Sequence, residues 1–287
     1  MKWQGGRQSG NFEDRRGMSS GGKVAIGGIG GVIILLIGLF MGGDPAQLLQ
    51  QIGTGQEATT GEVRQLNAEE QRLTEFSRVV LQSTEDVWGK LFQEQVNRTY
   101  PPAKLVVYDR NTPTDGCGMG QSAYGPFYCP GDNTIYMDLT FNDELSQRFG
   151  AKGEFALAYV IAHEVGHHIQ NILGVLKQTN AMRAKMGERE YNKISVMTEL
   201  QADFYAGVWA HYVNKNSDIE LTYDDIVDGM QAAAAVGDDH IQQEAQGYTN
   251  PESFTHGTSE QRAYWFKKGY ETGDLNAGNT FNDPRLK

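Results

Sequence analysis

The sequence predicts a mostly helical α+β fold with one small antiparallel sheet, preceded by a single transmembrane helix. Three observations carry this prediction. Apolar residues recur at helical spacing through most of the chain after residue 150, two short β-rich runs precede them, and an uncharged apolar run lies near the N-terminus. The periods of 3.6 and 2 residues distinguish helices from strands.

The uncharged run covers residues 24–43. It is long enough to cross a bilayer as a helix, which takes about 20 residues. The apolar core of a signal peptide is the alternative, but such a core usually has about 7–15 residues and a small-residue cleavage site follows it. No such site follows Gly43, so we expect an uncleaved anchor. Gly27 and Gly31 have the spacing of close helix contacts, which would permit a homodimer.

Charge near this run predicts how the chain is placed across the membrane. Glu13 and Asp14 are outnumbered by basic residues before the run, namely Lys2, Arg7, Arg15, Arg16 and Lys23. The positive-inside rule then keeps residues 1–23 in the cytoplasm, with one crossing by the anchor and the rest of the chain outside. The polar, glycine-rich residues 44–61 predict a flexible linker, and residues 62–287 form the domain. A net charge of −11 argues against nucleic acid as a partner.

The first part of the domain contains helix and then strand patterns. Residues 67–97 are apolar at helical spacing, with Asn67 as an N-cap and a second cap-like sequence at Thr84, which predicts two helices. Residues 104–109 and 134–139 are β-rich and bounded by turn-forming residues. They predict two strands that pair as the small sheet.

Cys117 and Cys129, the two cysteines of the chain, lie between these predicted strands. In an oxidising compartment they are expected to form a disulfide. A pair of zinc ligands is the alternative, but the C-x₂-C spacing and the second pair of a structural zinc site are both missing. We therefore expect the disulfide.

Helices are predicted at residues 153–173, 194–213, 223–236 and 259–270, and the first of them carries an H-E-x-x-H sequence. His163 and His167 are four residues apart, so they lie on one helical face and could bind one Zn²⁺. Glu164 would lie close enough to act on a water bound to that metal. The alternative is a helix that happens to carry two histidines.

Catalytic zinc sites usually have three protein ligands, and the predicted helix at 194–213 offers the third. Glu199 and Asp203 lie four residues apart on it. We expect Glu199 to bind the metal and Asp203 to accept the second N–H of an imidazole, that of His163. Two solvated carboxylates are the alternative, but the neighbouring residues are apolar, and unpaired carboxylates are costly on a buried helix.

His256 precedes the last predicted helix on a loop. From there it could donate a hydrogen bond to the oxyanion of a reacting carbonyl, although a purely structural hydrogen bond is an equal alternative. His168 is five residues from His163 and therefore off the shared face. His211 and His240 have no partner pattern, and we expect all three to be ordinary histidines.

These residues together predict hydrolysis of a peptide bond. Zinc would activate a water and polarise the carbonyl, Glu164 would act as general base, and His256 would stabilise the intermediate. A strand beside the zinc helix could bind an extended peptide by edge pairing. The candidates for this contact are Ile135, Tyr136 and Met137.

The chain resembles the bacterial neutral zinc metallopeptidases of the YpfJ-like group. The similarity runs nearly end to end and includes residues 1–5, 11–16, 125–130, 159–168, 199–203 and 254–259. It implies a zincin-like, gluzincin-type domain with Glu199 as third ligand and an anchor in the bacterial inner membrane, the domain being periplasmic or extracellular. The segment from His256 to Arg262 is also similar to the H-P-x-x-x-x-R loop of membrane-associated gluzincins.

The chain departs from that family at two positions together. Its members carry two further cysteines at the positions of Phe204 and Gly278, and both are absent here. The resemblance therefore implies that one whole disulfide is lost, and that Cys117 and Cys129 form the one retained. The attachment of the C-terminal tail is left open.

The leading expectation is a membrane-anchored zinc peptidase that acts on peptides or proteins. A catalytically idle, zinc-containing scaffold or peptide-binding domain of the cell envelope is the alternative. The presence of Glu164, which metal binding does not need, favours the enzyme. A soluble cytosolic protein with reduced cysteines is a third reading.

Overall fold

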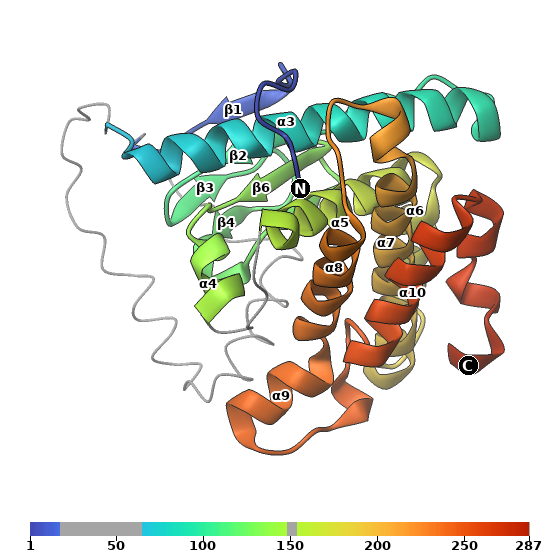
Figure 1. Ribbon diagram of the computed structural model, residues 1–287. Helices are drawn as coiled ribbons and strands as arrows, with labels where there is room; N and C mark the ends of the chain where they lie inside the picture. Colours follow the sequence, from blue (N-terminus) through green and yellow to red (C-terminus); the bar gives the residue numbers. More distant parts are fainter. Residues whose placement is uncertain (18–64, 148–153, 287) are drawn as a thin grey trace.

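A computed structural model describes residues 1–17, 65–147 and 154–286. Figure 1 shows one long helix, α3, lying over a small sheet, with a group of helices below and beside them. The expected anchor (24–43) and linker (44–61) fall outside the described residues. Among the residues that are described, no helix combines the length and apolar character needed to cross a membrane.

Helix α3 (Ala68–Leu91) is a single helix where the sequence predicted two. Asn67 caps it as expected, and the side chain of Glu70 closes a capping box with the Asn67 backbone. Thr84, predicted to start a second helix, is buried and donates its hydroxyl proton to the Leu81 carbonyl. A threonine can satisfy its hydroxyl in this way inside a helix, so the cap-like sequence is not a boundary. A π-helical turn, Phe92–Val96, ends the segment.

The main sheet has four strands in the order β1-β2-β6-β5. They are β1 (Phe12–Asp14), β2 (Lys104–Val107), β5 (Phe127–Cys129) and β6 (Thr134–Met137). The predicted strands β2 and β6 do pair, but in parallel, so the expected antiparallel pairing is wrong. The long connection between them makes the parallel arrangement feasible. Only β5 runs antiparallel to its neighbour, β6.

A hairpin of β3 (Asn111–Pro113) and β4 (Met119–Gln121) lies in that connection. The Cys117–Cys129 disulfide joins its loop to β5, which confirms the predicted pairing. The sheet is buried on both faces. One face packs into the main core through Leu105, Val107, Ile135 and Met137, while the other forms a smaller apolar cluster of Val106, Tyr108, Cys129 and Tyr136.

Seven further α-helices belong to the described part of the fold, besides short 3-10 turns. They are α4 (Phe141–Gln147), α5 (Glu154–Ile172), α6 (Val175–Arg183), α7 (Glu188–Asn216), α8 (Tyr223–Ala235), α9 (Asp238–Gln246) and α10 (Ser259–Thr272). The four predicted helices correspond to α5, α7, α8 and α10. Helices α4, α6 and α9 were not predicted, because each is short and mostly polar.

Helix α7 is the centre of the helical group, with α5 and α10 packed against it (Figure 1). Glycines allow α7 and α10 to approach very closely. A Cβ atom added at Gly207 would lie 2.0 Å from the Phe266 carbonyl oxygen, and one at Gly269 would lie 2.0 Å from that of Phe204. Any larger residue at either position would separate the two helices, and with them the residues that α10 brings to α7.

Residues 1–17 are part of the same fold. Strand β1 pairs in parallel with β2, and the Trp3 indole is 2% exposed within the main core. This differs from the expected division of the chain, in which residues 1–23 stood apart from the domain at 62–287. The strand was not predicted because Phe12–Asp14 is short and carries two acidic residues. Such a strand has no clear alternating pattern of its own.

Candidate metal centre

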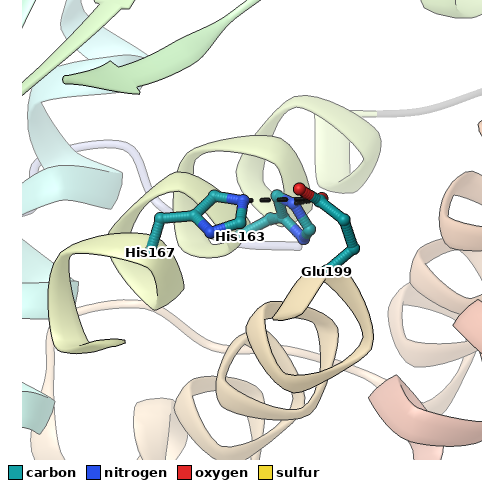
Figure 2. A group of neighbouring side chains, drawn as sticks. All are labelled: His163, His167 and Glu199. Carbon is teal, nitrogen blue, oxygen red and sulfur yellow. Dashed lines mark hydrogen bonds and ion pairs between the residues drawn. The ribbon is translucent and has the colours of Figure 1, made fainter. Parts of the chain in front are cut away.

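The H-E-x-x-H sequence lies in the middle of α5, opposite the first half of α7. Figure 2 shows His163 and His167 from α5 and Glu199 from α7 converging on one point. The Glu199 Oε2 atom lies 3.2 Å from His163 Nε2 and 3.5 Å from His167 Nε2. One ligand atom from each residue falls within 4.8 Å of the others. The two helices therefore bring together the three predicted ligands.

This arrangement fits a zinc ion. Zinc bonds to imidazole nitrogen and carboxylate oxygen are about 2.0–2.2 Å long, so two ligand atoms of a tetrahedral site are about 3.3–3.5 Å apart. The separations from Glu199 match that spacing. Both imidazoles use Nδ1 for hydrogen bonds to other residues, which leaves each Nε2 lone pair directed at Glu199 and at the site. Two neutral nitrogens and one carboxylate form a ligand set suited to Zn²⁺.

A buried charged network fixes His163. Its Nδ1–H donates to Asp203 Oδ1 at 2.8 Å, as the sequence predicted. Asp203 is fully buried, accepts from the Tyr159 hydroxyl, and pairs with Arg262, whose Nε donates to Oδ2 at 2.8 Å. Burial by itself would raise the pKa of Asp203, but Arg262 and His163 outweigh it and lower that pKa to about 2. Asp203 is therefore a carboxylate that can only accept, which sets the tautomer of His163.

A neutral amide holds His167. Its Nδ1–H donates to Gln170 Oε1 at 2.9 Å, while Gln170 Nε2 donates to the Thr198 carbonyl at 2.7 Å and contacts Gln201. Gln170 has no exposed surface. Neither Gln170 nor Tyr159 was predicted from the sequence. The available signal was spacing, because Gln170 is three residues after His167 on the same helix and hence on its face.

Glu164 is buried, with 7% of its surface exposed. Its carboxylate nevertheless has no hydrogen-bond partner among the residues described by the structure. Burial raises its pKa, and the nearby imidazoles His167 and His163 oppose that rise. A carboxylate with a raised pKa is a stronger base than an ordinary carboxylate. Glu164 is thus equipped to serve as a base beside the site.

His256 lies next to Glu199 through the loop that precedes α10. A Cβ added at Gly257 would lie 3.2 Å from Val196 Cγ1 and 3.3 Å from Leu200 Cδ2, so this loop packs on the turn of α7 that carries Glu199. The His256 side chain is 47% exposed. Burial lowers its pKa, but the neighbouring Asp238 outweighs this and leaves the pKa above its usual value.

Asp238, the first residue of α9, organises this loop. Its Oδ2 accepts the backbone N–H groups of Thr255, His256 and Gly257 at 2.6–2.9 Å, and its Oδ1 lies 3.2 Å from His256 Nδ1. With Nδ1 engaged, Nε2 is the nitrogen of His256 that remains to contact another molecule. Asp238 was not predicted from the sequence, because its partners lie 17–19 residues further along the chain and no local pattern links them.

Charge in the site favours metal binding at neutral or higher pH. Burial lowers the pKa of His167, but Glu199 outweighs burial and raises it to about 9. A zinc ion must displace the protons that Glu199 attracts to the imidazoles. Zinc affinity should therefore increase with pH, with release of protons on binding.

The substrate-strand prediction is wrong. Ile135 and Tyr136 lie on β6, which has β2 on one side and β5 on the other, and Met137 is paired with β2. A strand with neighbours on both sides has no free edge for a peptide. The remaining histidines are placed as expected, away from the ligand group: His168 is 3.0 Å from the Tyr128 hydroxyl, and His211 Nδ1 contacts the Tyr270 carbonyl at 2.5 Å.

The two positions where the resembled family carries cysteines are in contact. A Cβ added at Gly278 would lie 2.4 Å from the Phe204 ring, so the side chain of Phe204 packs directly against Gly278. Hydrogen bonds also fasten the tail: Gln201 Nε2 donates to the Gly278 carbonyl at 2.9 Å and the Thr280 hydroxyl donates to the Met197 carbonyl at 2.6 Å. The C-terminal tail is therefore attached to α7 without the second disulfide.

Comparison with known proteins agrees with this centre. The profile of the family described as "Putative neutral zinc metallopeptidase" matches residues 1–281. Uncharacterized protein YpfJ of Escherichia coli (strain K12) is 45% identical over 289 residues, which cover 98% of this chain and 99% of YpfJ. Uncharacterized protein Mb2605 of Mycobacterium bovis is 50% identical over 176 residues, 58% of each chain. No solved structure matches. The chain belongs to the neutral zinc metallopeptidase family that this profile describes.

Proposed function

We propose that the protein is a zinc-dependent peptidase in which Glu164 is the general base. The observation that carries this proposal is a complete three-ligand group with the buried carboxylate of Glu164 beside it, which has no hydrogen-bond partner in the described part of the chain. A site that only held zinc for structure would have four protein ligands and no need of Glu164. Three protein ligands leave one position for water or substrate.

Each residue has a distinct part in the proposed reaction. Zinc, when bound by His163, His167 and Glu199, supplies Lewis acidity, which polarises a carbonyl and makes water a better nucleophile. Glu164 accepts the proton of the attacking water and passes it to the leaving amine. His256, whose Nδ1–H donates to Asp238, donates a hydrogen bond from Nε2 in its protonated form to the oxygen that gains negative charge, and its raised pKa favours that form.

Strand β5 takes over the substrate-binding role that the sequence analysis gave to β6. It is the last strand of the sheet on the side of α5, and no strand of the described residues pairs with its outer edge. Its Tyr128 contacts His168, the neighbour of the ligand His167. An extended peptide added to this edge would lie beside the metal centre, with its backbone groups satisfied by those of β5.

The experiment is zinc analysis of the purified protein, followed by incubation with a denatured protein with and without a chelator. We expect stoichiometric zinc, and cleavage that the chelator abolishes and zinc restores. Glu164→Gln should keep the zinc and lose about 10²–10⁴-fold in cleavage rate, the usual contribution of a general base. Glu190→Gln, the same change on the exposed surface of α7, should be unaffected.

Two outcomes would count against the proposal. Stoichiometric zinc without cleavage of any denatured protein would favour the scaffold reading, in which the same group binds metal and the domain only binds peptides. Cleavage by Glu164→Gln at the rate of the unchanged protein would remove Glu164 from the mechanism.

A further inference from the structure

The first seventeen residues are held against the domain along most of their length. Trp3 Nε1 donates to Glu154 Oε2 at 2.9 Å, and its ring meets Phe76 edge to face at 5.2 Å. The backbones of Lys2 and Glu220 exchange two hydrogen bonds of 2.9 and 3.0 Å. The segment therefore contacts α3, the start of α5 and the connection between α7 and α8, in addition to β2.

Three basic residues of this segment also contact the domain. Arg7 Nε donates to Asp218 Oδ2 at 2.8 Å, and its Nη2 donates to Asp86 Oδ2 at 2.7 Å. Lys2 pairs with Glu220 at 2.7 Å. Arg16 donates to Thr74 Oγ1 at 2.6 Å. Lys2, Arg7 and Arg16 are among the residues that gave the expected cytoplasmic placement of residues 1–23, but in the folded protein they contact the domain that was expected across the membrane.

Arg16 also fixes where the chain leaves and re-enters the domain. Thr74 is in the second turn of α3, which begins at Ala68, and a helix rises about 1.5 Å per residue. The end of the N-terminal segment and the start of α3 therefore meet at one end of the domain. The apolar run at 24–43 lies in the chain between these two points, whatever path that chain takes.

Strand pairing and a single membrane crossing are incompatible here. Paired strands are about 4.8 Å apart. The hydrocarbon core of a bilayer is about 30 Å thick. If the run at 24–43 crossed once, β1 and β2 would be on opposite sides of that core and could not pair.

We propose that residues 1–17 and 65–286 lie in the same compartment, so that the apolar run between them does not place β1 and β2 on opposite sides of a membrane. The Cys117–Cys129 disulfide indicates that this compartment is oxidising, hence outside the cytoplasm. This proposal does not depend on whether the metal centre hydrolyses peptides.

The test uses cysteines at Lys2 and Glu220 in the full-length protein in its native membranes. Both side chains are mostly exposed, at 81% and 66%, so the changes should not disturb folding. Residues that exchange two hydrogen bonds across antiparallel backbones have Cα atoms about 5.5 Å apart, within the range of a disulfide. Lys2→Cys with Glu220→Cys should cross-link on mild oxidation and shift in mobility on a non-reducing gel.

Lys2→Cys with Glu244→Cys is the matched control, because Glu244 is exposed on α9, which lies well away from the N-terminus in Figure 1. It should not cross-link. A second measurement is labelling of single cysteines at Gly10 and at Glu244 with a membrane-impermeant maleimide, before and after the membrane is opened. Gly10 has nothing within 4 Å of an added Cβ, so the change is tolerated. We expect both sites to label under the same condition. Labelling from opposite sides, or no cross-link between positions 2 and 220, would overturn the proposal.

Discussion

The metal centre and the N-terminal segment are both rich in charged pairs, but the pairs contribute differently. In the centre, Asp203 and Arg262 are 0% and 4% exposed, so each charge depends on the other. In the segment, the Arg7 and Lys2 side chains are 60% and 81% exposed and water can replace their partners. Exposed pairs contribute little to stability. The N-terminal segment must therefore be held mainly by Trp3 and by strand pairing, whereas buried charge determines the geometry of the metal centre.

The largest effect should come from breaking the buried pair in the centre. Asp203→Asn leaves the Arg262 guanidinium buried without a counter-charge, which typically costs about 3–5 kcal/mol in the free energy of unfolding. The same change frees the His163 imidazole to rotate, so zinc affinity should fall about 10–100-fold. Chemical denaturation and competition with a metal indicator measure the two quantities separately.

A double variant separates the two effects. Asp203→Leu with Arg262→Met replaces both charges with apolar side chains, and such replacement of a buried pair is often neutral for stability. We expect stability to recover and zinc affinity to remain low. Recovery of both stability and zinc affinity would mean that Asp203 has no part in orienting His163. Buried charge would then not determine the geometry of the metal centre.

An intermediate effect is expected from Trp3→Ala. Loss of a buried tryptophan side chain usually costs about 3–5 kcal/mol, and the cost here should be near 3 because the segment is at the surface and can shift to fill the space. Zinc affinity should not change. Gln8→Ala, an exposed change in the same segment, is the control and should stay within about 0.5 kcal/mol of the unchanged protein. An unchanged stability for Trp3→Ala would show that residues 1–17 are not part of the folded domain.

The two regions also differ in how far the sequence could predict them. His163, Glu164, His167, Glu199 and Asp203 all lie at helical spacings, so local periodicity is enough to place them on shared faces. Gln170 follows the same rule and could have been found. Asp238 and Arg262 act through contacts with distant segments, and no spacing within one helix indicates them.

The N-terminal strand shows the same limit more strongly. Phe12–Asp14 has three residues, and its partner β2 begins ninety positions later in the chain. Strand pairing of this kind depends on the assembled sheet rather than on any local pattern. The direction of β2 and β6 was misjudged for the same reason, because the hairpin between them was not recognised as part of a crossover.

The smallest effect should be a pH dependence carried by β1 itself. Glu13 accepts hydrogen bonds from Arg15 and Lys104, and these lower its pKa from 4.5 to about 2. A carboxylate with a lowered pKa in the folded state stabilises the fold above its unfolded pKa and loses that contribution as the pH falls toward the folded pKa. The side chain is 35% exposed, so the contribution should be no more than about 1 kcal/mol.

Glu13→Gln should therefore be less stable than the unchanged protein at pH 7, with the difference shrinking below pH 4.5 and vanishing near pH 2. Urea unfolding midpoints across this range measure it. Glu75→Gln, on the exposed face of α3, provides the matched change without these partners. A stability difference that stayed constant down to pH 2 would mean that Glu13 acts by packing rather than by charge. Charge would then determine the geometry of the metal centre but contribute nothing at β1.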